Sequence, residues 1–109
     1  MVMDILYNDL SPDSPRKAEL QARMLPHSIV ALSTPSGPPA WAEAMFDGRR
    51  GYIRTPGDQT NPVVLQDGWI KNSGVEWDVE TLEAGHCPFI SQPEQLSELC
   101  LGYFKKWAL

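Results

Sequence analysis

The residues of this chain best suited to chemistry are one histidine and one aspartate, in two separate loops. His86 lies in the segment Gly85–Pro88, just before a strongly amphipathic C-terminal stretch. Asp58 lies in the turn-forming segment Pro56–Thr60. A carboxylate beside an imidazole fixes the imidazole tautomer and stabilises the protonated ring. If the fold brings the two together, the histidine is suited to act as a base near neutral pH.

Two strands and two helices would have to position these loops. Residues 51–55 predict a short strand, and Asn61 followed by Pro62 predicts a helix N-terminus. That helix would run to about Ser73 and stop at Gly74. Residues 75–80 alternate apolar and acidic side chains, the pattern of a second strand with one acidic face.

A final helix is predicted after the histidine loop. Ser91 and Glu94 form an S-x-x-E capping box, which is typical of a helix start. Apolar residues then recur at helical spacing along one face: Leu96, Leu99, Cys100, Tyr103, Phe104 and Trp107. The order from residue 51 onward is therefore β-α-β-α.

This order predicts where Asp58 and His86 lie. A β-α-β unit of this size makes two parallel strands joined by a right-handed crossover. Both strands then end at the same edge of the sheet, where ligand sites of open parallel sheets are found. Each residue also has a simpler interpretation, since Asp58 could cap the next helix and His86 could be a structural loop histidine.

The N-terminal half is less regular. A helix is predicted to start between Asp13 and Pro15 and to end at Pro26. Residues 27–32 could form a helix or a strand, residues 33–39 predict a linker, and residues 40–46 predict one or two helical turns. His27, directly after Pro26, is expected to be exposed, with a cap residue facing a pocket as the alternative.

Several stretches together resemble a known family. The segment Tyr52–Asp58, the helix opening Asn61-Pro62 and the segment Gly85–Glu94 are similar to the C-terminal third of the α/β-hydrolase fold. The resemblance is to small esterase-type hydrolases of the plant methylesterase and hydroxynitrile lyase group and their fungal relatives. It implies that Asp58 is the acid and His86 the base of a catalytic triad. The segment from Leu6 to Trp41 more weakly resembles the end of that family's cap.

The resemblance implies a partial α/β-hydrolase fold in two parts. Residues 1–47 would be a cap-like helical segment with a Pro-rich hinge, and residues 48–109 the C-terminal β-α-β-α unit with two parallel strands. The nucleophile is absent, because no G-x-S-x-G elbow occurs in the sequence. Since a complete domain of this type needs about 250 residues, the chain is expected to be truncated and inactive in isolation.

Composition excludes several other classes of function. The net charge is −5 and no cluster of basic residues occurs, so nucleic acid is not expected as a partner. No apolar run is long enough to span a membrane, and the first residues lack the features of a signal peptide. Cys87 and Cys100 lack zinc-site spacing, which predicts free thiols in a cytoplasmic protein without metal or cofactor.

Three functions therefore remain open from the sequence. The chain could derive from an enzyme acting on an ester or similar small carbonyl compound, with His86 as base and Asp58 as its orienting acid. It could be a non-catalytic binding or interaction module, or an independent small α/β ligand-binding protein. A sheet of only two strands covers little of the apolar surface of the helices, so we expect part of that surface to be exposed. We expect the exposed surface to cause self-association or to bind a partner chain. This exposed apolar surface is expected to include some of the residues Trp69, Trp77, Tyr103 and Trp107.

Overall fold

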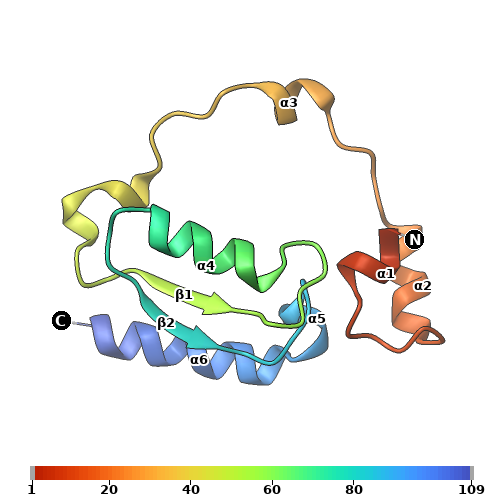
Figure 1. Cartoon of the computed structure of the whole chain (residues 1–109). Coiled ribbons are helices and arrows are strands. Elements are labelled where there is room, and N and C mark those ends of the chain that lie inside the picture. Colours follow the sequence, from red (N-terminus) through yellow and green to blue (C-terminus); the bar gives the residue numbers. More distant parts are fainter. Residues whose placement is uncertain (1, 109) are drawn as a thin grey trace.

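The C-terminal half of the chain is a mixed helix and strand unit built on a parallel sheet. The computed structural model describes residues 2–108. From residue 51 the elements follow the predicted β-α-β-α order with one additional short helix, α5 (Figure 1). They are β1 (Gly51–Arg54), α4 (Val63–Asn72), β2 (Asp78–Thr81), the short helix α5 (Pro88–Ser91) and the long helix α6 (Pro93–Trp107).

The two strands pair in parallel, as predicted. Gly51 lies opposite Asp78, and Arg54 lies opposite Thr81. Within residues 2–108 the sheet consists of these two strands. Figure 1 shows α4 on one face of the sheet and α6 on the other, so both faces carry a helix. The helices therefore cover more of the sheet surface than we expected from the sequence.

Helix α6 is fixed to the sheet by Tyr103, which is only 8% exposed. Its hydroxyl group donates hydrogen bonds to the carbonyl oxygens of Asp78 (2.6 Å) and Tyr52 (3.2 Å), one on each strand. The ring lies so near the backbone that a Cβ atom at Gly51 would stand 2.9 Å from it. Glycine at this position therefore allows the helix to approach the strand closely.

Helix α4 is fixed by a buried amide, Gln66, which is 2% exposed. The Gln66 side chain accepts a hydrogen bond from the Thr55 N–H (2.9 Å) and donates to the carbonyl oxygens of Thr55 (3.0 Å) and Asn61 (2.8 Å). Because Thr55 and Asn61 flank the loop that carries Asp58, this side chain joins the loop to the helix.

The N-terminal half contains short helices and a long arch. The helices are α1 (Val2–Leu6), α2 (Pro15–Ala22) and α3 (Ile29–Ser33), followed by the 3₁₀ turns η1 (Ala40–Ala42) and η2 (Ala44–Phe46). Figure 1 shows α1 and α2 beside the end of the sheet where α5 lies, and α3 on the arch away from it.

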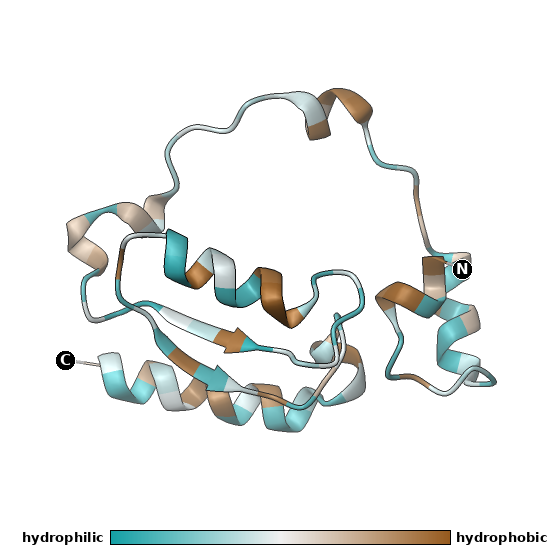
Figure 2. Cartoon of the chain, viewed as in Figure 1, coloured by the Kyte–Doolittle hydropathy of each residue, from teal (hydrophilic) through white to brown (hydrophobic). Residues whose placement is uncertain are grey.

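The exposed apolar surface lies partly where we did not expect it. The apolar residues of α3, coloured brown in Figure 2, are exposed: Ile29 (82%), Val30 (73%) and Leu32 (75%). Among the predicted aromatic residues Trp69 is half exposed, whereas Tyr103 is buried against the sheet. Of the four aromatic residues from which the exposed surface was expected to draw, Trp69 is thus exposed and Tyr103 is not.

Several predicted boundaries also differ from the structure. The capping box is wrong: α6 begins at Pro93, and the Ser91 hydroxyl donates to Asp9 instead of capping the helix. Helix α4 begins one residue later than predicted, after Pro62. Strand β2 begins only at Asp78. The stop at Gly74 is confirmed, since this glycine has a φ of +74°.

Candidate active site

Asp58 and His86 meet at the carboxyl edge of the sheet. Asp58 follows β1 and His86 follows β2, so parallel pairing brings the two loops to the same edge. His86 Nδ1 lies 2.9 Å from Asp58 Oδ2 and 3.2 Å from Oδ1. The Asp58 side chain is 5% exposed and that of His86 is 26% exposed. The predicted proximity is confirmed, and the pair presents a buried acid behind a partly accessible imidazole.

Asp58 is also held by the backbone of its own loop. Its Oδ1 atom accepts hydrogen bonds from the N–H groups of Thr60 and Asn61, each at 2.8 Å. The aspartate thus caps the turn before α4 and contacts His86 with the same carboxylate. The two interpretations of Asp58 left open by the sequence are both consistent with this geometry.

These contacts keep Asp58 ionised. Burial by itself raises the pKa of the Asp58 carboxyl group, because it disfavours the charged form. The hydrogen bonds from the Asn61 N–H, His86 and the Thr60 N–H outweigh burial and hold its pKa below the usual value. An ionised carboxylate is only an acceptor, so His86 Nδ1 must carry the proton.

In the neutral ring, a proton on Nδ1 leaves the lone pair of His86 Nε2 available. Within residues 2–108 no group hydrogen bonds to Nε2. The ring is partly exposed, so a reactant can approach it. The arrangement can therefore accept a proton at Nε2 while Asp58 stabilises the resulting charge.

Two residues near the N-terminus contribute to the site and were missed by the sequence analysis. Asn8 Nδ2 donates to the Gly57 carbonyl oxygen (2.8 Å), and Asp9 Oδ2 accepts from the Gly85 N–H (2.8 Å). They lie in the turn after α1, and Asp9 is 76 residues from Gly85 in the chain. No local pattern could have indicated these contacts.

The other candidate residues either lie away from the Asp58–His86 pair or are poorly reactive. Cys87 is 8% exposed, and burial, with the nearby negative charges of Asp9 and Asp58, raises the pKa of its thiol. It is therefore held in the protonated, poorly nucleophilic form. Cys100 is half-buried on α6. His27 is exposed on the arch before α3.

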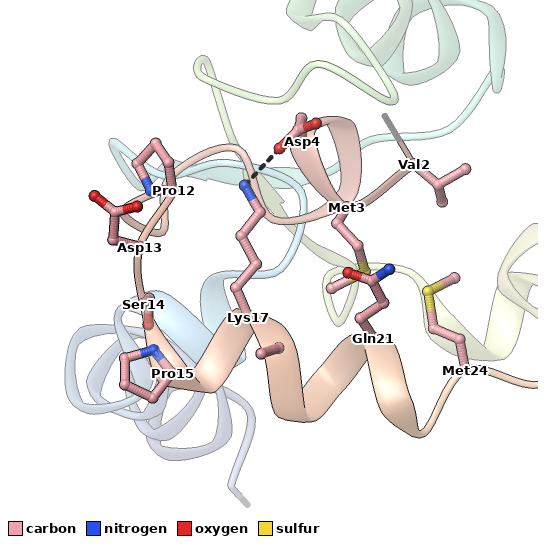
Figure 3. Close-up of a pocket in the computed structure, with 11 residues that line it drawn as sticks. Val2, Met3, Asp4, Pro12, Asp13, Ser14, Pro15, Lys17, Gln21 and Met24 are labelled. Atoms are coloured by element: carbon pink, nitrogen blue, oxygen red, sulfur yellow. Dashed lines mark hydrogen bonds and ion pairs between the residues drawn. The ribbon is translucent and has the colours of Figure 1, made fainter.

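A cavity of about 650 Å³ lies elsewhere, between α1 and α2. Figure 3 shows its lining, with Lys17 pointing toward Asp4 across the cavity. Lys17 Nζ lies 2.8 Å from Asp4 Oδ1, and this hydrogen bond is the main reason why the pKa of Asp4 falls to about 2. Neither Asp58 nor His86 lines this cavity.

The described part of the chain contains neither a metal-binding cluster nor a membrane-spanning helix. Within residues 2–108 no cluster of three or more histidine, cysteine, aspartate or glutamate side chains could hold a metal ion. None of the helices in that range is long and apolar enough to cross a membrane.

Comparisons with known proteins point to plant methylesterases. No protein-family model and no solved structure matches the chain. The chain is 27% identical over 99 residues to the Arabidopsis thaliana protein named "putative methylesterase 13, chloroplastic", covering 91% of this chain and 21% of that protein. It is 29% identical over 102 residues to "putative methylesterase 11, chloroplastic" of the same plant, covering 93% and 25%. The chain is thus similar along most of its length to two proteins named as methylesterases, and it spans only about a quarter or less of theirs.

Proposed function

We propose that Asp58 and His86 are the acid–base part of an esterase-type hydrolytic site for an ester or similar small carbonyl substrate. The observation that carries this proposal is the 2.9 Å hydrogen bond between a buried carboxylate and Nδ1 of a partly exposed histidine. The similarity to proteins named as methylesterases supports the ester as substrate class.

In such a site His86 works as base and then as acid. Nε2 takes the proton of a hydroxyl nucleophile as its oxygen attacks the carbonyl carbon, and Asp58 stabilises the imidazolium. When the carbon–oxygen bond to the leaving group breaks, His86 returns the proton to the departing oxygen. No G-x-S-x-G segment occurs in these 109 residues, so they provide no serine on such an elbow.

The 109-residue chain therefore makes a specific test possible. Because the serine elbow is missing, we expect no serine-hydrolase turnover by the isolated chain. What we expect is a slow background reaction with an activated aryl ester such as p-nitrophenyl acetate, in which His86 Nε2 attacks the ester or activates water. His86→Ala should remove most of the rate above buffer. His27→Ala is the matched control, because His27 is the other histidine and is exposed without a carboxylate contact in the described structure. It should remove less than half.

A fluorophosphonate probe tests the nucleophile separately. We expect no labelling of the chain and no loss of rate, because the serine elbow is missing. Equal losses in the two histidine variants would contradict a special role for His86. Labelling that disappears when one serine is replaced would contradict the assignment of these residues as an acid–base pair alone.

The exposed side chains of α3 favour a second candidate function, a binding or interaction module. Ile29, Val30 and Leu32 are each at least 73% exposed and adjoin one another on one short helix. Large exposed apolar groups that are close together often mark interaction sites. Such a role needs no catalysis and could coexist with an inactive Asp58–His86 pair.

A further inference from the structure

The turn after α1 contacts both loops of the candidate active site at equivalent positions. Asn8 binds the carbonyl oxygen of Gly57, the residue directly before Asp58. Asp9 binds the N–H group of Gly85, the residue directly before His86. Two adjacent side chains thus each bind the residue that directly precedes one member of the pair.

The packing around these contacts leaves little freedom. A Cβ atom on Gly85 would stand 2.5 Å from Asn8 Oδ1 and 2.9 Å from the Asp9 carboxylate carbon. The Gly57 N–H also donates to the Ala84 carbonyl oxygen at 3.0 Å, which joins the two loops directly. The turn therefore contacts the backbone of both loops where a hydrogen bond joins them.

We propose that Asn8 and Asp9 are positioning residues that set the distance between Asp58 and His86. The proposal rests on the proposed function of this pair, since a fixed distance matters only if the pair acts as one unit. Catalysis is sensitive to misplacements of about 1 Å. Without the two contacts, the Gly57–Ala84 hydrogen bond would be the backbone link left between the two loops among the described residues, and their relative position would be less restricted.

The test is NMR spectroscopy of the whole chain, read at His86. The Nδ1–H proton of His86, held by a carboxylate, should give a low-field resonance that exchanges slowly with water. In Asp9→Ala we expect the exchange rates of this proton and of the Gly85 amide to rise about tenfold or more, because one hydrogen bond is lost. Asn8→Ala should have the same effect on the His86 proton.

Two matched variants separate positioning from general destabilisation. Asp9→Asn keeps an oxygen acceptor for the Gly85 N–H and should restore the His86 signal. Ser91→Ala removes the other partner of the Asp9 carboxylate and should leave the signal unchanged. Amide shifts of Tyr52 in β1 report whether the sheet remains folded in each variant.

The outcomes decide the proposal independently of enzymatic turnover. The proposal is overturned if the exchange rate of the His86 Nδ1–H proton is unchanged in both Asp9→Ala and Asn8→Ala while the sheet stays folded. It is also overturned if this proton exchanges as fast in Asp9→Asn as in Asp9→Ala. If the unmodified chain shows no His86-dependent ester hydrolysis, the proposed function fails, while the NMR comparison still decides whether Asn8 and Asp9 position the pair.

Discussion

Replacing Asp58 with alanine removes three hydrogen bonds from one buried carboxylate. Two of them come from the N–H groups of Thr60 and Asn61, each at 2.8 Å, and the third from His86. A hydrogen bond to a charged group contributes about 1.5–3 kcal/mol. Thr60 and Asn61 are only half-buried, so water can partly replace the lost acceptor. We therefore expect the lower part of this range, about 1.5–2 kcal/mol for each amide.

Amide hydrogen exchange measures this loss locally. A change of about 1.4 kcal/mol is a factor of ten, so exchange at Thr60 and Asn61 should rise roughly tenfold to thirtyfold in Asp58→Ala. Asp58→Asn keeps an oxygen acceptor and should raise exchange by less than about fivefold. Asp67→Ala is the control, because Asp67 pairs with the Arg54 side chain instead. Unchanged protection in Asp58→Ala would refute the capping role derived for Asp58.

The same amides should report the ionisation of Asp58. The pKa of Asp58 is lowered in the folded chain, so its contribution is complete above the unfolded value of about 3.9. It is lost as the pH falls through the lower, folded value. Protection of Thr60 and Asn61, corrected for intrinsic exchange, should thus persist down to about pH 4 and decline only below it. A decline centred near pH 6 would show that another group controls this loop.

Two further predictions concern stability and association. Gln66→Ala should lower the free energy of unfolding by about 2–4 kcal/mol in a denaturant titration, because it leaves the buried Thr55 N–H without its acceptor. Gln66→Glu should not restore this stability, because a buried carboxylate keeps the acceptor but loses the amide donor to the carbonyl oxygens of Thr55 and Asn61. A loss below about 0.5 kcal/mol in Gln66→Ala would contradict the role of this amide. The chain should self-associate in light scattering and bind a hydrophobic dye, and replacing Ile29, Val30 and Leu32 with serine should reduce both. A monomer that binds no dye would contradict the association expected from these exposed residues.

The sequence by itself determined the order of the C-terminal elements and the place of the candidate pair. Short-range signals were sufficient: alternation before Thr81, turn residues at Pro56–Thr60, and a glycine stop at Gly74. Parallel pairing then follows from the length of the crossover, and it brings Asp58 and His86 to one edge. These inferences succeed because strand and helix patterns depend on neighbouring residues.

Only the tertiary structure decided which partners complete the site. Ser91 has the spacing of a helix cap, yet its hydroxyl binds Asp9, because folding brings a carboxylate from the first turn of the chain within reach. Asn8 likewise reaches Gly57 across 49 residues. Hydrogen bonds between distant side chains and backbone groups leave no periodic trace in a sequence, since they depend on how whole elements pack and not on their local propensities.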